Sequence, residues 1–202
     1  MGALRTPREK WVEAGLQALA DGGPDAVRVE ALAKGLGVTK GGFYGYFADR
    51  GALLEEMLDT WERRAVDDVL ERVGREAGDV REGVRLARRM FTDGSMLPID
   101  LAVRDWARRD RAVAQRLERV DGRRMQFLRE AIGSLCRDAG TGSGTNSATG
   151  PETRSEVVEA RCLLAFCLAI GQHFLAAEHP GHTPEQVRAR AADLVLNVGA
   201  DR

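Results

Sequence analysis

The chain has 202 residues, 30 lysines and arginines against 31 aspartates and glutamates, and a hydrophobic fraction of 44%. This length buries a core without disulfides, which excludes collagen, coiled-coil rods and disulfide-stabilised miniproteins. The formal net charge of −1 excludes a global field that would draw the chain onto nucleic acid or an acidic membrane, so a charged partner has to meet a local patch.

Apolar residues recur at helical spacing along the chain, with no convincing two-residue alternation, which predicts an all-α fold. Two capping boxes, Thr6-Pro7-Arg8-Glu9 and Thr183-Pro184-Glu185-Gln186, indicate helix starts, and Asp49 is a third N-cap. The expected helices, in chain order, are 7–20, 29–36, 39–47, 50–69, 80–91, 98–106, 111–135, 156–177 and 184–198. Residues 138–153, rich in Gly, Ser and Thr, are expected to form a mobile loop.

The N-terminus and the cysteines indicate a soluble, cytoplasmic chain. The first residues lack the apolar segment of a signal peptide, and no uncharged apolar run reaches the roughly 18 residues of a membrane span. Three cysteines are an odd number, and two of them lie in apolar helical sequence, which favours reduced thiols. We therefore expect no disulfide and no membrane partner.

Residues 28–54 have the spacing of a helix-turn-helix. Ala33 is small where two helices would cross closely, and Gly37, four residues later, can take the positive φ that a tight turn needs. Thr39 stands where it can cap the next helix, and Phe43 falls on the buried side of that helix.

The segment from Val38 to Leu54 resembles the recognition helix, and the start of the following helix, of the TetR family of bacterial transcriptional regulators; the resemblance extends from Thr6 to about Leu58. It implies an N-terminal three-helix helix-turn-helix DNA-binding domain, residues 1–53, and a C-terminal helical effector-binding and dimerisation domain, residues 54–202. It also implies a homodimer on a near-palindromic operator of double-stranded DNA, with the third helix of each subunit in the major groove and half-sites ~35 Å apart.

The resemblance also assigns roles to residues. Thr39 and Tyr44 occupy positions whose hydroxyls contact phosphates, Tyr46 lies at a neighbouring position, and Arg50 replaces a lysine that contacts the DNA backbone. Lys40 and the glycines after it occupy the positions closest to base edges. With Arg28, which adds to a net charge of 4 − 2 = +2 over residues 28–50, the candidate DNA-binding residues are Arg28, Thr39, Lys40, Gly41, Gly42, Tyr44, Tyr46 and Arg50.

Three glycines, Gly41, Gly42 and Gly45, lie in this short recognition helix, and each lowers helix stability by roughly 1 kcal/mol relative to alanine. We expect the helix to be loosely formed without DNA and to become ordered on the operator. Few side chains remain to contact bases, so DNA shape is expected to contribute to specificity.

The resemblance implies an effector pocket among the middle helices, and the methionine and aromatic residues there suit a cavity for apolar ligands. The alternative for each is ordinary core packing. The candidate pocket residues are Met90, Phe91, Met96, Trp106, Met125 and Phe127. A lipophilic or aromatic effector is expected, although nine arginines between residues 104 and 129 form either a solvated face or contacts to an anionic effector.

The last two expected helices are more apolar than one chain needs, which predicts a four-helix interface between two subunits. The candidate interface residues are Val157, Leu164, Leu168, Leu175, Val187, Leu194 and Val198. Packing within one chain is the alternative for part of them.

No enzyme motif is present: the chain has no phosphate loop, no Gly-x-Ser-x-Gly sequence and no metal signature. Cys162 and Cys167 are five residues apart and do not share a helical face, so neither a metal nor another cofactor is expected. The resemblance therefore implies a ligand-responsive repressor. A ligand-dependent activator, and a dimeric small-molecule-binding scaffold with little DNA binding, are the alternatives.

Overall fold

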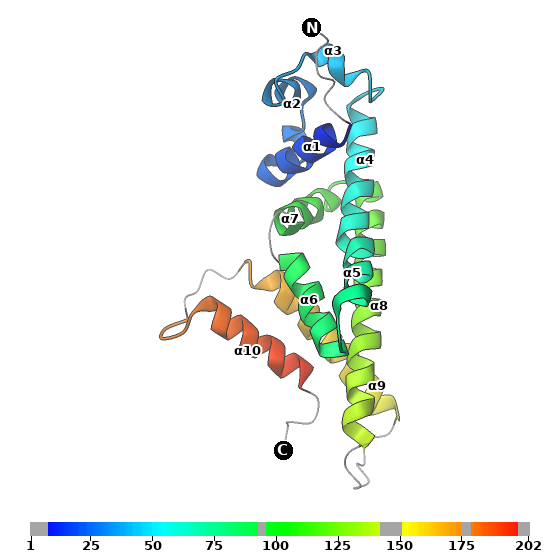
Figure 1. Ribbon diagram of the computed structural model, residues 1–202, viewed down its shortest axis with the longest axis vertical. Helices are drawn as coiled ribbons and strands as arrows, with labels where there is room; N and C mark the ends of the chain where they lie inside the picture. The colour runs from blue at the N-terminus through cyan, green and yellow to red at the C-terminus, as the bar shows by residue number, and fades with distance from the viewer. Residues whose placement is uncertain (1–7, 93–95, 142–150, 175–178, 198–202) are drawn as a thin grey trace. The chain divides into compact units, whose positions relative to one another are not determined.

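The computed structural model describes residues 8–92, 96–141, 151–174 and 179–197, and these residues form helices and turns with no strand. The all-α prediction is confirmed (Figure 1). The helices are α1 (Arg8–Gly22), the 3-10 turn η1 (Pro24–Ala26), α2 (Val29–Gly35), α3 (Lys40–Phe43), α4 (Arg50–Glu62), the π-helical turn η2 (Arg63–Asp67), α5 (Asp68–Glu76), α6 (Val80–Thr92), α7 (Met96–Ala107), α8 (Arg111–Thr141), α9 (Pro151–Gly171) and α10 (Pro184–Leu196).

The chain divides into two compact units. Unit 1 comprises Met1–Glu71 and Met90–Asp121, and unit 2 comprises Arg72–Arg89 and Gly122–Arg202. Unit 1 thus groups α7 with the first four helices, whereas the expected domain boundary after residue 53 divides the chain by function and stays a prediction.

Unit 1 has one core built around α1. Trp11, Leu16 and Leu19 of this helix are buried together with residues of α4 and α7. Within the unit, α1 lies between α2 and α7, and α4 passes alongside (Figure 1). Gly15 permits the close approach of α1 to α4, because a Cβ at this position would meet Met57 Sδ at 2.6 Å.

Unit 2 contains two smaller apolar clusters. One joins Val84 of α6 and Leu135 of α8 to Leu196 of α10, and the other joins α8 to α9 through Cys136 and Cys162. Arginines from two helices close the end of α10, where carbonyls lack partners within the helix. Arg81 donates to the Leu196 carbonyl oxygen at 2.8 Å, and Arg161 donates to that of Val195 at 2.7 Å. The capping box at the start of α10 is confirmed, with Gln186 N–H donating to Thr183 Oγ1 at 3.2 Å.

Several helix boundaries differ from those expected. The helix that begins after Asp49 runs on through a π-helical turn into α5 and ends at Glu76, beyond the expected residue 69. In α9 the helix begins at Pro151 and ends at Gly171, not at 156 and 177. Helix α8 reaches Thr141, so helices occupy both ends of the segment expected to be a loop.

Some predictions fall outside the described residues: the first capping box at Thr6, residues 142–150 of the expected loop, and the interface candidates Leu175 and Val198. No helix within the described ranges is long and apolar enough to cross a bilayer.

Candidate nucleic-acid interface

The turn between α2 and α3 has the geometry that the sequence predicts. Gly37 has φ +68°, a left-handed conformation that strains any residue with a side chain. Val38 N–H donates to the Ala33 carbonyl oxygen at 2.9 Å, which fastens the residue after the turn to α2. The predicted positive φ is confirmed.

Helix α3 is shorter than predicted. It spans only Lys40–Phe43, and the chain continues to Tyr46 in turns, with Phe47 N–H donating to the Phe43 carbonyl oxygen at 3.1 Å. The helix was expected to reach Phe47; the glycines in this segment weaken its propensity and account for the early end. Thr39 holds the N-cap position with an extended backbone, but its side chain makes no capping hydrogen bond, so the prediction of a side-chain cap is wrong.

One buried side chain fixes the position of α3. The ring of Phe43 is fully buried, lies edge-on to Trp11 at 5.4 Å between centroids, and stacks with Phe47 at 5.2 Å. Tyr44 also meets the Phe43 ring edge-on, yet it remains 55% exposed. The aromatic cluster therefore holds the segment from below and leaves its outer face open.

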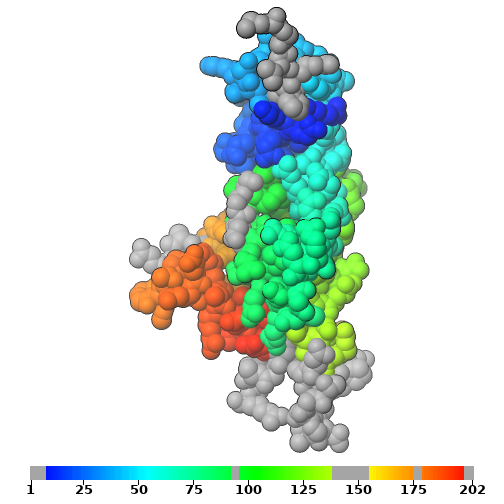
Figure 2. Space-filling model, viewed as in Figure 1, coloured from blue at the N-terminus to red at the C-terminus, as the bar shows by residue number. Residues whose placement is uncertain are grey.

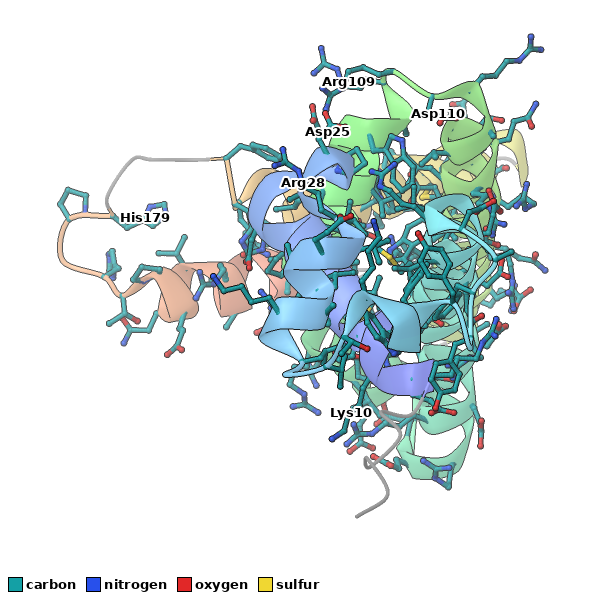
Figure 3. All side chains as sticks on the ribbon, turned by 90° about the horizontal axis from the view of Figure 1, so that it is seen from above. Lys10, Asp25, Arg28, Arg109, Asp110 and His179 are labelled. Carbon is teal, nitrogen blue, oxygen red and sulfur yellow. The ribbon has the colours of Figure 1, made fainter. Side chains whose placement is uncertain are left out.

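Most of the candidate DNA-binding residues are exposed on this face. The exposed ones are Arg28, Thr39, Lys40, Gly41, Gly42 and Tyr44, whereas Tyr46 and Arg50 are half-buried. In Figure 2 the light-blue residues of α2 and α3 lie near one end of unit 1, and Figure 3 is viewed from that side. Arg28 extends beside Asp25 at the start of α2 (Figure 3), and its Nε donates to the Asp25 carbonyl oxygen at 3.1 Å.

Lys40 is paired within the chain. Its Nζ donates to Glu30 Oε1 across the α2–α3 angle, and both side chains are exposed. The hydrogen bond raises the pKa of Lys40 and lowers the pKa of Glu30. A partner that uses Lys40 therefore competes with Glu30.

Arg50 has a contact that the sequence did not indicate. Its Nε donates to the Val27 carbonyl oxygen at 2.7 Å, and its Nη2 donates to the carbonyl oxygen of Pro24. The side chain thereby fastens the connection between α1 and α2 to the first turn of α4. Asp49 caps this turn as predicted, accepting from Ala52 N–H at 2.8 Å. The phosphate contact that the resemblance implies for Arg50 stays a prediction.

Sequence reasoning missed Arg8, which contacts both α4 and the turn that follows α3. Its Nε donates to both carboxylate oxygens of Glu56 at 2.8 and 2.7 Å, and its Nη1 donates to the Tyr46 carbonyl oxygen at 2.6 Å. The guanidinium carbon lies 4.5 Å from the centre of the Phe47 ring. Glu56 is 48 residues away along the chain, so no local spacing in the sequence signals this contact.

The candidate effector residues do not gather in one cluster of the described structure. Met96 and Trp106 pack against the core of unit 1, whereas Phe127 and Met125 pack against two different clusters of unit 2. Met90 and Phe91 are half-buried in unit 1. A surface hollow of about 410 Å³ in unit 1 lies between the end of α1 and α7, and none of the six candidates lines it. A pocket lined by the candidates stays a prediction.

Several arginines of the cluster between residues 104 and 129 form ion pairs. Those with a carboxylate partner are Arg104, Arg109, Arg116, Arg119 and Arg129. Arg116 alone contacts Glu55, Asp59 and Glu62 of α4; burial opposes the charge, but these hydrogen bonds raise the pKa of Arg116. Some of the arginines predicted to form a solvated face thus link α8 to α4 within unit 1 through ion pairs.

A partly buried network of hydrogen bonds between polar side chains also crosses unit 1. Asp100 of α7 is fully buried and accepts hydrogen bonds from Trp61 Nε1 at 3.2 Å and Arg104 Nε at 2.9 Å. The other side of the Arg104 guanidinium donates to both oxygens of Asp121, at 2.8 and 2.7 Å. This network connects α4, α7 and α8.

The candidate interface residues differ in exposure. Val157, Leu164 and Leu194 are exposed, and Leu168 and Val187 are half-buried. Leu163 and Phe174 are exposed as well and were not among the candidates. Helix α9 therefore presents an apolar surface that its own chain leaves uncovered.

The cysteines differ in environment. Cys162 is buried against α8, and burial raises its pKa to about 11, whereas Cys167 is exposed. Within the described ranges, no three residues of the types His, Cys, Asp and Glu come together as they would around a metal ion.

Comparison with known proteins agrees with this geometry. Residues 12–57 match the family model of the bacterial regulatory proteins of the tetR family. FadR from Bacillus subtilis, solved with stearoyl-CoA, shares 13% identity over 94% of this chain and 98% of its own, with a TM-score of 0.62. AibR, solved with isovaleryl coenzyme A and operator DNA, shares 14% identity over 92% of this chain and 96% of its own, with a TM-score of 0.61.

A protein from Rhodococcus sp. assigned to the TetR-family transcriptional regulators shares 20% identity over 94% of this chain and 98% of its own, with a TM-score of 0.58. At these identities the likeness shows the fold. No curated protein matches this chain in sequence. The segment 12–57 thus matches the model of the tetR-family regulators, and the chain shares the fold of solved structures described as members of that family.

Proposed function

We propose that the chain is a transcriptional repressor that binds a near-palindromic operator as a homodimer and releases it when a small molecule binds. The observation that carries this proposal is the exposed face of α3, held from below by Phe43 and Trp11. A short helix with a buried anchor and an open outer face is what a recognition helix needs in the major groove. No catalytic step and no cofactor are part of the proposal, and its setting is the cytoplasm.

We propose acyl-CoA thioesters as the effector class. Two structures with this fold were solved with such ligands, stearoyl-CoA in FadR and isovaleryl coenzyme A in AibR. An acyl chain also fits the lipophilic effector that the methionine and aromatic residues of the middle helices predict. Met90, Phe91, Met96, Trp106, Met125 and Phe127 are the side chains to substitute first.

Release would occur by a shift in population between two states of the dimer. The effector binds one state more tightly, and in that state the two recognition helices are spaced wrongly for the operator. Helix α4 is the element through which the shift would reach α3, because it begins directly after the recognition segment and is tied to α8 by Arg116.

Operator binding is tested by selecting duplexes from a random pool with the wild-type chain and measuring mobility shifts on the enriched sequence. We expect a near-palindrome with half-sites about one helical turn apart. Lys40→Ala and Tyr44→Phe should weaken binding, Lys40→Ala mainly by relaxing base preference and Tyr44→Phe by losing a phosphate contact. Failure to enrich any palindrome would favour the alternative, a dimeric scaffold that binds small molecules without DNA.

The effector class is tested by adding isovaleryl-CoA or stearoyl-CoA to the operator complex, with free coenzyme A as the control. Release by a thioester but not by free coenzyme A supports the proposal. Tighter operator binding in the presence of the thioester would instead favour the ligand-dependent activator. No response to either thioester would leave the regulator standing and exclude these two acyl-CoAs as its effectors.

A further inference from the structure

The recognition segment does not hold its own position. Helix α3 has four residues, its N-cap side chain makes no hydrogen bond, and a Cβ added at Gly42 would meet nothing within 4 Å. Beyond Phe43, backbone hydrogen bonds from Tyr46 and Phe47 to the Phe43 carbonyl oxygen keep the turn in shape. The position of Tyr44 and Tyr46 therefore depends on contacts from outside the segment.

Arg8 provides such contacts at the end of the segment. It donates to the carbonyl oxygen of Tyr46 and lies over the ring of Phe47, so that it holds both the backbone and a side chain of the turn. The opposite edge of the same guanidinium binds the carboxylate of Glu56, one and a half turns into α4. A planar guanidinium can make these contacts together because its donors point in fixed, divergent directions.

We infer that Arg8 is a positioning residue for operator recognition, which fixes the turn after α3 on α4 and so sets where Tyr44 and Tyr46 meet the DNA. The inference rests on the proposed function. It differs from a direct role, because the donors of Arg8 named above point into the protein and not toward a phosphate. It also gives α4 a physical connection to the recognition segment, through which a displacement of α4 moves the turn.

The test compares Arg8→Met with Lys10→Met, a matched loss of one positive charge from the exposed side of the same helix (Figure 3). Two measurements are made on each full-length protein. The first is hydrogen exchange of the Tyr46 and Phe47 amides without DNA, with the buried α7 residues Ile99 and Val103 as the reference. The second is affinity for the selected operator at several salt concentrations.

For Arg8→Met we expect exchange at Tyr46 and Phe47 to rise by about tenfold with α7 unchanged, and operator affinity to fall by about tenfold, the effect of one charge-assisted hydrogen bond. The slope of log affinity against log salt should stay at the wild-type value, because no phosphate contact is lost. Lys10→Met should leave the exchange unchanged. A slope reduced by about 0.9 in Arg8→Met would show that Arg8 contacts a phosphate and would overturn the inference.

Two further variants keep the test decisive. Arg8→Lys retains a cation for Glu56 but lacks the fork that reaches Tyr46, so exchange should remain raised. Glu56→Gln keeps the Tyr46 contact and loses the ion pair, so its exchange at Tyr46 and Phe47 should exceed that of the wild type and stay below that of Arg8→Met. If Arg8→Met does not fold, the rise of Glu56→Gln above the wild type still tests the inference. Wild-type protein that selects no operator would refute the proposed function, whereas wild-type-like operator binding by Arg8→Met would refute only this inference.

Discussion

Under the proposed function, Glu30 would compete with DNA for Lys40. The carboxylate pairs with the only lysine among the candidate DNA-binding residues, and it carries a negative charge on the proposed DNA-binding face. We expect Glu30→Gln to strengthen binding to random duplexes more than binding to the operator, since a freed lysine contacts phosphates of any sequence. The salt slope should steepen by about 0.9 for the phosphate gained.

Titrations of fluorescent operator and random duplexes over a range of salt concentrations measure the two affinities and the dependence of each on salt. Glu13→Gln is the control, because it removes another exposed carboxylate, which pairs with Arg64 instead. An unchanged slope in Glu30→Gln would mean that Lys40 contacts no phosphate when it is released.

Asp100 is the charge on which the interior of unit 1 depends. It accepts from Trp61 and Arg104 in a fully buried site, and an ionised group in such a site is tolerated only with partners. Asp100→Asn removes the charge that Arg104 binds, and we expect the free energy of unfolding to fall by about 3 kcal/mol. Urea unfolding followed by tryptophan emission measures the loss.

Asp105→Asn is the matched comparison for Asp100→Asn. Asp105 lies on the same helix and pairs with Arg109 at 2.5 Å, but the pair is exposed, so its removal should barely change stability. Equal losses in the two variants would show that the network contributes no more than a surface ion pair.

Whether a residue could be predicted from the sequence depended on the distance along the chain to its partner. Gly37 and Asp49 were assigned correctly because their roles are set within three or four residues, by a turn and a helix cap. The contact of Arg8 with Glu56 and that of Asp100 with Trp61 were missed because the partners lie 48 and 39 residues apart, where no helical spacing connects them. For Arg50 the resemblance suggested a DNA contact, whereas the contact in the structure is a backbone one 23 residues away.

Helix α3 and the turn before it use glycine for opposite reasons. Gly37 needs its left-handed conformation, whereas Gly42 has helical neighbours and open space where a side chain would go. Gly37→Ala should lower the free energy of unfolding by about 1–2 kcal/mol, because alanine is strained at that φ. Gly42→Ala should raise it by up to about 1 kcal/mol through helix propensity, and should slow exchange at Phe47.

Operator affinity shows whether DNA approaches the backbone closely at Gly42. Since its added methyl group meets no atom of the chain, any loss of operator affinity in Gly42→Ala reports a close approach of DNA to the backbone. Thermal unfolding and operator titration of both variants measure the two effects. Stability shifts of the same sign in the two variants would contradict the assignment.

At the scale of elements, hydrophobic periodicity predicted where helices exist but not where they end. Apolar residues recur at helical spacing because one face of each helix is buried, so the sequence of each helix shows this pattern. Ends depend on competing contacts: α3 stops early because glycines weaken it, while α8 passes Gly122 without a break, and residues before and well after Gly122, Val120 and Ile132, are buried. The π-helical turn after α4 adds a residue to one turn, and nothing in the spacing of apolar residues indicates it.

For the whole molecule, a dimer would account for both the near-neutral charge and the exposed apolar residues of α9. Under the proposed function, a chain with net charge −1 would gain little from general attraction to DNA, and its selectivity would depend on two recognition helices held at a set distance. A second copy of the chain would supply that distance. Exposed apolar residues on α9 are where a second copy would be expected to pack, because patches of this kind mark association sites.

Leu164→Asp tests this arrangement. Leu164 is 58% exposed, next to the equally exposed Leu163, and a carboxylate placed there would be buried without a partner in a dimer. Light scattering after size exclusion should give twice the mass of one 22.1 kDa chain for the wild type and the mass of a single chain for the variant. Operator affinity should fall by at least about 100-fold, because a monomer binds one half-site without the second.

Gln115→Asp, which places the same charge on an exposed position of α8, should remain dimeric. If Leu164→Asp kept the wild-type mass, the subunits would associate through another surface, and the exposed leucines of α9 would need a different partner.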